Sequence, residues 1–407
     1  DMPPLVSEPS MPPSSEIVPS VHATTMKTWD HLDRTTGAMQ LERMVATPEI
    51  RAKVRDVTAG CSTPEEKVAR LYHWVQKNIR YISIKSSLSS GWSGHPAEET
   101  FRQGYGDCTD KAVLFATMLQ VVGVDSEPVV VRTNDRGIFL PRYPVLACNH
   151  AFNEVRFDDK RLFLDCTTQD HRYPSLRADD HGVLATNFIR GTRERVPVPP
   201  GPLGSGKINE EAMTLRADGT LEVQTSNRYA GRYEAGLRAG WKRVPEKMRL
   251  QVMQQYLNGI APGARLLSFD LPDPKDLSTP FTLSFAYELP DYLVTAGPIR
   301  IFQFPDRERS FPEASLEKRK YDLVYTTSEA LEREVSLEIP AALRVLALPE
   351  DVTFENAYVS YRESFRRDGS RLLFRCRFER STRRVPVEDY AEHRDLLQRL
   401  QHHTSWP

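Results

Sequence analysis

The 407-residue chain has little of several features that mark special classes of protein. No run of about 18 apolar residues occurs, so no membrane-spanning helix is predicted. The formal net charge is −1, which gives no overall field for nucleic acid or an anionic membrane. Five cysteines are too few for a disulfide scaffold, and no two of them have Cys-x-x-Cys spacing. These absences leave a globular chain that is long enough for two or three domains.

The start of the chain also lacks an initiator Met and a charged-then-apolar leader, since it opens at Asp1. Six prolines fall within residues 1–20, and the apolar residues there follow no helical or strand period. This composition predicts an extended, Pro-rich linker over residues 1–30. We expect the chain to be a processed product or a fragment, with the linker leading from a missing upstream domain.

Beyond the linker, the sequence pattern divides into two domains. Residues 31–196 mix helical periods with strand-like runs. Residues 207–407 read mostly as alternating strands with two Asp-Gly hairpins, interrupted by helices near 246–258 and 387–402. The segment PVPPGPLGSG, residues 197–206, is the linker between the domains. The predicted fold class is α+β, with a β-rich, sandwich-like C-terminal domain.

Helix signals in the first domain are local. One short helix is predicted between about 35 and 56. In STPEEKVARLYHWVQKNI, Thr63 and Glu66 form a capping box that starts a second helix. In YGDCTDKAVLF, Asp107 caps a third helix and places Cys108 in its first turn.

Cys108 is a candidate nucleophile because the dipole at a helix start favours a thiolate. A catalytic cysteine also needs a base and a group that orients the base. His150 lies early in the predicted strand HAFNEVRF, and Asp165 ends the next strand, RLFLD. If these strands form an antiparallel hairpin, we expect His150 to sit opposite Asp165, within hydrogen-bonding reach.

These three stretches resemble the transglutaminase-like superfamily, which has a papain-like fold. The run YGDCTDKAVLFATMLQVVGV resembles its nucleophile helix, and HAFNEV its His-Ala-Trp-x-x-Val strand with Phe152 in place of Trp. FLDCTT resembles its Asp-Pro-Thr strand, with Cys166 in place of Pro. The resemblance implies a papain/transglutaminase-like core over 31–196 and a Cys108–His150–Asp165 triad. The sequence is similar to a bacterial subgroup of this family that carries an N-terminal β-domain, absent here, and a β-rich C-terminal region.

The remaining parts of a catalytic centre are harder to locate. A second oxyanion donor besides the Cys108 backbone N–H is expected upstream, and Trp92, His95 and Gln103 are the candidates. Zinc binding by Cys108, His150 and Cys166 is an alternative on ligand type alone, although the paired spacing is missing. We therefore predict no metal and no organic cofactor; calcium enters by family analogy only.

The triad predicts cysteine-dependent acyl transfer at amide bonds, through a thioester on Cys108. Two alternatives stay open: a peptidase or amidase with the same triad, and a binding module with a vestigial triad. The expected partner is a protein or peptide substrate, with no nucleic acid and no transmembrane segment. The family resemblance implies an exported protein of the periplasm or the extracellular space.

Overall fold

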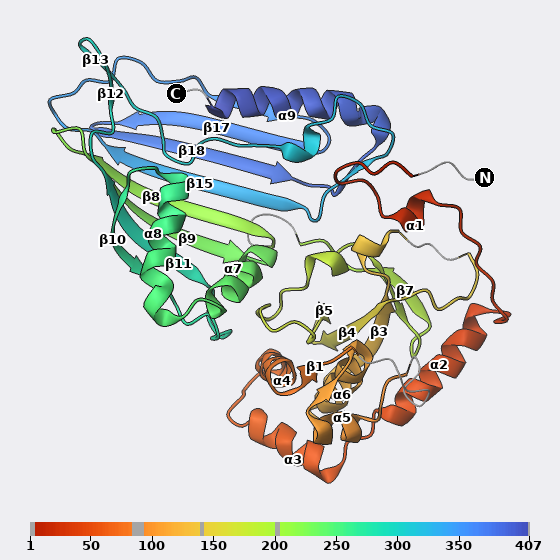
Figure 1. The fold of residues 1–407 in the computed structure, drawn as a ribbon. Coiled ribbons are helices and arrows are strands. Elements are labelled where there is room, and N and C mark those ends of the chain that lie inside the picture. Colours follow the sequence, from red (N-terminus) through yellow and green to blue (C-terminus); the bar gives the residue numbers. More distant parts are fainter. Residues whose placement is uncertain (1–4, 84–92, 139–141, 200–203, 406–407) are drawn as a thin grey trace. The chain divides into compact units, whose positions relative to one another are not determined.

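The computed structural model describes residues 5–83, 93–138, 142–199 and 204–405. The chain folds as two compact units (Figure 1). One unit is Pro13–Pro199, and the other combines Asp1–Pro12 with Pro200–Pro407. Across the described ranges, no helix is both long enough and apolar enough to span a bilayer.

The unit Pro13–Pro199 is built from helices around a small sheet. Its helices are α1 (Ser14–Ile17), α2 (Trp29–Arg43), α3 (Pro48–Val57), α4 (Pro64–Asn78), α5 (Ala97–Gln103) and α6 (Cys108–Val121). Its strands are β1 (Arg80–Tyr81), β2 (Tyr105–Gly106), β3 (Asp125–Val131), β4 (His150–Phe157), β5 (Lys160–Leu164), β6 (Leu184–Asn187) and β7 (Thr192–Arg195). The last five strands form an antiparallel sheet in the order β5-β4-β3-β6-β7.

The helix starts follow the sequence signals. The capping box of Thr63 and Glu66 is formed at the start of α4, as predicted. The single helix predicted over 35–56 is wrong, because two helices stand there. Thr47 caps α3 and Pro48 occupies its first turn, so the chain cannot continue from α2 as one helix.

Helix α6 is the centre of this unit. Its residues from Cys108 to Leu119 are all buried, with helices α3, α4 and α5 on one side and strands β3 and β4 on the other. Leu114, Phe115 and Leu119 share one core with Leu71 and Val75 of α4. The first turn of α6, which carries Cys108, is therefore held by packing on both sides.

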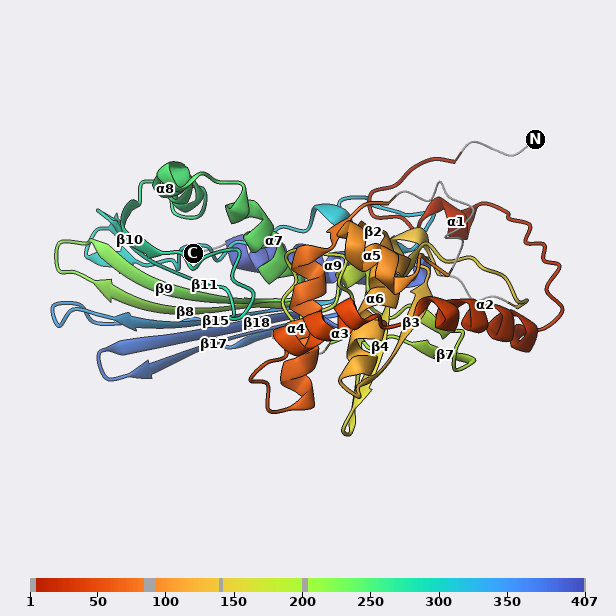
Figure 2. The ribbon, with the colours of Figure 1, turned by 90° about the horizontal axis from the view of Figure 1, so that it is seen from below.

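The second unit is dominated by one large sheet (Figures 1 and 2). Its strand order is β10-β11-β9-β8-β15-β18-β17-β16, and only the β8–β15 pair is parallel among these described strands. The strands are β8 (Gly206–Leu215), β9 (Leu221–Ala230), β10 (Arg265–Asp270), β11 (Thr282–Leu289), β15 (Glu329–Glu338), β16 (Val352–Glu355), β17 (Val359–Asp368) and β18 (Arg371–Arg380). Short pairs are β12 (Val294–Ala296) with β13 (Ile299–Ile301), and β14 (Leu323–Val324) with β19 (Arg384–Val385).

Three helices complete the unit: α7 (Arg232–Lys242), α8 (Arg249–Ile260) and α9 (Tyr390–Ser405). Their apolar residues join the core on one face of the sheet, with Trp241 from α7, Met253 from α8 and Leu400 from α9. The β-rich second domain and the α+β class are confirmed. A layer of helices and loops, rather than a second large sheet, covers the core face.

Both predicted Asp-Gly hairpins are confirmed, at 218–219 between β8 and β9 and at 368–369 between β17 and β18. A glycine is needed at the second position of each Asp-Gly pair, because Gly219 has a φ of +89° and Gly369 a φ of +60°. The start of the chain also belongs to this unit. The Ser10 carbonyl accepts a hydrogen bond from the Val324 N–H at 2.7 Å. Ser10, which lies in the predicted linker, is thus bonded to the edge of strand β14.

Histidine 393 of α9 predicts a pH dependence of stability. It is fully buried between Tyr325, whose hydroxyl lies 2.7 Å from Nε2, and Asn356. Burial, with Arg380 acting in the same direction, lowers the pKa of His393 to about 4. An unfolded histidine titrates near ~6.5. The stabilisation is therefore complete above pH ~6.5 and is lost as pH falls from there toward the folded-state value.

When the pH falls from 7 to 5, we expect His393 to lower the unfolding free energy of this unit by about 2 kcal/mol. Urea unfolding of the wild type and His393→Gln at both pH values measures it. His402→Gln, on the exposed side of the same helix, is the matched control. An equal loss of stability in wild type and His393→Gln would contradict the assignment.

Candidate active site

Cys108 occupies the first position of α6, as the sequence predicts. Asp107 caps the helix: its Oδ1 accepts the N–H groups of Thr109 at 2.9 Å and Asp110 at 3.1 Å, while Asp110 Oδ2 accepts the Asp107 N–H. The cap leaves out the Cys108 N–H, for which no acceptor is found within the described ranges. That N–H can therefore serve a ligand at the helix start.

His150 and Asp165 are brought together from the β4–β5 hairpin. The His150 Nε2 lies 3.1 Å from Asp165 Oδ2, and both side chains are buried. The predicted direct opposition of these residues is wrong. Asn153 pairs with Leu164, so the same register puts Phe152, not His150, level with Asp165. The contact forms because β5 ends at Leu164 and the chain turns there.

That turn fixes the Asp165 carboxylate. Its Oδ1 accepts the Thr167 N–H at 2.8 Å, and its Oδ2 accepts the Thr167 hydroxyl at 2.9 Å. The backbone carbonyl of Asp165 accepts the Tyr72 hydroxyl of α4 at 2.9 Å. The residue is thus bound at three points besides His150, which holds the carboxylate in one orientation.

The opposite charges of His150 and Asp165 stabilise each other. Burial by itself lowers the pKa of His150, but the Asp165 carboxylate outweighs it and leaves the pKa well above the usual value. Burial conversely raises the pKa of Asp165, and the His150 charge outweighs that effect and lowers it. The Cys108 thiol also acts on the His150 ring and raises its pKa further. Cysteine, imidazole and carboxylate therefore interact in series.

The thiol is covered. Cys108 is 1% exposed and lies in a small apolar cluster with Leu32, Val130, Ala151 and Phe188. Met26, Trp29, Leu146 and Cys148 pack against this cluster from outside. Among the described residues, Cys108 is therefore enclosed by apolar side chains.

The other predicted site residues have different surroundings. Trp92 lies outside the described residues. The His95 N–H and Nδ1 lie 2.7 Å and 3.0 Å from Asp110 Oδ1, so His95 is fixed to the first turn of α6. Gln103 is exposed at the end of α5 and donates to Glu99 at 2.9 Å, which ties it to its own helix instead of to the thiol.

The zinc alternative is wrong. Cys166 is buried in the core beneath α6, in a different cluster from Cys108, and burial raises the pKa of its thiol well above the usual value. Within the described ranges, the close group of donor atoms is instead His150, Asp165 and Asp180. His150 is bonded to Asp165, and Arg177 Nη1 lies 3.9 Å from the same carboxylate.

Asp180 was missed by the sequence analysis. It ends the short 3₁₀ helix Ala178–Asp180, and its Oδ2 lies 3.9 Å from His150 Nε2. In the sequence it stands in RADDHG, which has the composition of an exposed turn. No spacing in the sequence signals that this turn folds back under His150.

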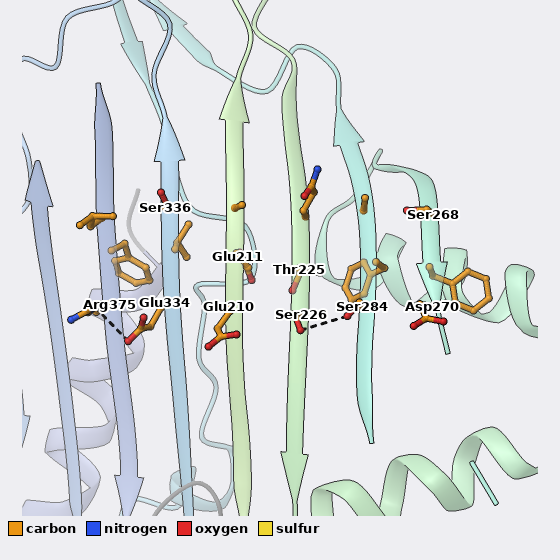
Figure 3. Close-up of a pocket in the computed structure, with 18 residues that line it drawn as sticks. Glu210, Glu211, Thr225, Ser226, Ser268, Asp270, Ser284, Glu334, Ser336 and Arg375 are labelled. Atoms are coloured by element: carbon orange, nitrogen blue, oxygen red, sulfur yellow. Dashed lines mark hydrogen bonds and ion pairs between the residues drawn. The ribbon is translucent and has the colours of Figure 1, made fainter. Parts of the chain in front are cut away.

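The second unit has a wide groove of about 900 Å³ on the sheet face opposite the helices (Figure 3). Small side chains such as Ala212, Ser226 and Ser284 form its floor. Glu334 and Arg375 flank it and pair at 3.4 Å. Arg375 and Glu334 therefore lie on a solvated, ion-paired face of the sheet.

Two family models match the sequence. Residues 51–165 match the transglutaminase-like superfamily. Residues 299–405 match a domain of unknown function with a solved structure, DUF3858. No curated protein matches the chain.

Two solved structures are similar to it. A candidate protease from Parabacteroides distasonis ATCC 8503 is 12% identical with a TM-score of 0.54, over 93% of this chain and 57% of that one. This chain thus spans little more than half the length of that protein. A candidate cysteine protease from Cytophaga hutchinsonii is 14% identical with a TM-score of 0.24, over 31% of this chain and 41% of that one.

A cysteine at a helix start that faces a histidine and an aspartate from a neighbouring sheet defines a papain-like α+β domain. Residues 51–165 match the model of the transglutaminase-like superfamily, which confirms the resemblance of the three motifs. The subgroup with an upstream β-domain stays a prediction.

Proposed function

We propose that the chain is a cysteine-dependent acyltransferase or hydrolase that acts on amide bonds of a protein or peptide. The observation that supports this most is the buried His150–Asp165 pair, 3.1 Å apart, with the Cys108 thiol acting on the same imidazole. A structural cysteine does not need an imidazole partner, and an imidazole needs no buried carboxylate unless its charge is used.

In the proposed reaction, the Cys108 thiolate attacks the carbonyl carbon of the amide. The Cys108 N–H, left over by the Asp107 cap, donates to the oxyanion that forms. His150 gives its proton to the leaving nitrogen as the C–N bond breaks, and a thioester remains on Cys108. Asp165 keeps the imidazole in the required orientation and stabilises its charged form.

The second half of the reaction decides between the two enzyme classes. A primary amine that attacks the thioester gives transamidation, whereas water gives hydrolysis. Both attackers lose a proton to His150, so the triad serves either outcome. We favour acyl transfer from the family resemblance. The names of the similar structures favour hydrolysis, and at 12% identity they carry the fold alone.

The direct test is the reactivity of the thiols. At pH 6, an ordinary thiol is less than about 1% thiolate. We expect iodoacetamide at pH 6 to label Cys108 well before Cys61, a half-buried cysteine outside the site. Burial raises the pKa of Cys166 and Cys376, so these should stay unlabelled. Peptide mapping by mass spectrometry reads the result.

A mixture of peptides with a fluorescent primary amine then separates the classes. Incorporated amine indicates transamidation and new peptide termini indicate hydrolysis, and Cys108→Ala should abolish both while Cys61→Ala changes neither. If Cys61 is labelled first and Cys108 is inert, the triad is vestigial and the binding-module alternative holds.

A further inference from the structure

Asp180 is a second carboxyl group at the base of the triad. It is 0% exposed, and neither carboxyl oxygen has a hydrogen-bond partner within the described part of the chain. Its Oδ2 lies 3.9 Å from His150 Nε2, the same nitrogen that bonds Asp165. The donor atoms of these three side chains lie within 4.8 Å of one another. The imidazole edge thus faces two carboxyl groups.

An unpartnered buried carboxyl group is costly to a fold. Buried polar atoms are almost always satisfied, and an apolar group of similar shape would avoid the penalty. Among the described residues, neither carboxyl oxygen of Asp180 forms a hydrogen bond within the 3₁₀ helix Ala178–Asp180 or to the elements around it. The nearest group that gains from it is the His150 ring, on which Asp180 can act through its charge.

The charged and titratable groups that face Asp180 are few. Asp165 and His150 lie on one side, Arg177 and Asp179 come from its own turn, and the Tyr72 hydroxyl comes from α4. Arg177 is paired with Asp179, so its charge is largely matched. Burial, and then the neighbouring Asp165, raise the pKa of Asp180 well above that of an ordinary aspartate.

We propose that Asp180 is a positioning residue that acts through His150: when it is ionised, its charge keeps the proton on the imidazole. This role rests on the proposed function of the triad. At low pH, Asp180 holds a proton and Asp165 alone faces the imidazolium. As the pH rises, Asp180 releases that proton to solvent, and two carboxylates then oppose loss of the His150 proton. The site would thereby keep its general acid into the alkaline range.

Loss of Asp180 should change only the alkaline limb of the pH–rate profile of Cys108, and this makes the proposal testable. Without Asp180, the imidazolium should lose its proton at a lower pH, because a nearby negative charge typically shifts such a pKa by one to three units, roughly. The acid side of the profile should hardly move, because Asp180 is protonated and uncharged there, just as the amide of Asp180→Asn is uncharged. If Asp180 had only a structural role, its replacement would change the rate by the same factor at every pH and would shift neither limb.

Iodoacetate reads the imidazolium without any substrate. Its carboxylate is attracted by a charged His150, so alkylation of Cys108 should slow as that proton is lost. We would measure the rate from pH 5 to pH 10 for wild type and Asp180→Asn. The expected result is an alkaline limb about one unit or more lower in Asp180→Asn, with the acid limb in place. Asp159→Asn, at the exposed tip of the β4–β5 hairpin, should match wild type.

Asp180→Ser covers the case in which the amide variant does not fold, which thermal unfolding reports. An alkaline limb that stays in place in either folded variant overturns the inference. If Cys108 in the wild type does not react at any pH, the proposed function fails instead. Reaction with normal limbs in all variants leaves the proposed function intact and removes only the role of Asp180.

Discussion

Replacing Asp165 by Asn should lower turnover of an amide substrate by about 10⁴-fold, the effect of the same change in the Ser-His-Asp template. The reason is the hydrogen bond of 3.1 Å between Asp165 and His150 Nε2. An amide is neutral and can present a donor where the carboxylate accepts. The protonated imidazole of His150 then loses the carboxylate charge that stabilises it, and the neutral ring favours the opposite tautomer. Steady-state rates of purified wild type and Asp165→Asn measure the effect.

Thr167→Val provides a graded comparison. It removes only the hydroxyl that donates to Asp165 Oδ2 at 2.9 Å, and it keeps the carboxylate and the Thr167 backbone N–H bond. We expect a loss of about tenfold, in line with one net hydrogen bond of about 1.5 kcal/mol. A folded Asp165→Asn with wild-type turnover would exclude Asp165 from the mechanism, whatever Thr167→Val does.

Much of the site could be predicted because its parts are local. Asp107 and Asp110 form a capping box, and that pattern by itself places Cys108 in the first turn of a helix. The strands of His150 and Asp165 are joined by a two-residue turn, so their pairing follows from the chain. Their register did not follow, because it depends on the exact position of the turn. Phe157 pairs with Lys160 across that turn, and this places Phe152 level with Asp165.

Asp180 could not be predicted, because nothing near it in the sequence determines its neighbours. It reaches His150 only through the packing of the turn after β5 against α4 and the hairpin. Helix α7 was missed for a related reason. Its sequence RYEAGLRAGWK contains Gly236 and Gly240, which weaken a helix by roughly 1 kcal/mol each. Tertiary contacts must therefore hold it, and these contacts cannot be seen in the local sequence.

The main contact of this kind is Arg238, which predicts the largest effect on stability. Its side chain is 1% exposed and donates twice to Glu234 Oε1, at 3.0 and 2.8 Å. It also donates to the carbonyls of Asp276 at 2.5 Å and Thr279 at 2.6 Å. The guanidinium carbon lies 5.1 Å from the centre of the Phe281 ring. One side chain thus joins α7 to the loop before β11.

Arg238→Ala should lower the unfolding free energy of this unit by about 3–5 kcal/mol, because it removes one member of a buried ion pair. Arg243→Ala, at the exposed end of α7, should change it by less than about 0.5 kcal/mol. Urea unfolding followed by circular dichroism measures both. Removing both charges, as in Glu234→Leu with Arg238→Leu, should restore much of the stability, since a buried ion pair contributes little net energy over apolar packing. A double variant as unstable as Arg238→Ala would show that the lost bonds to the loop carbonyls, rather than the broken ion pair, account for the loss.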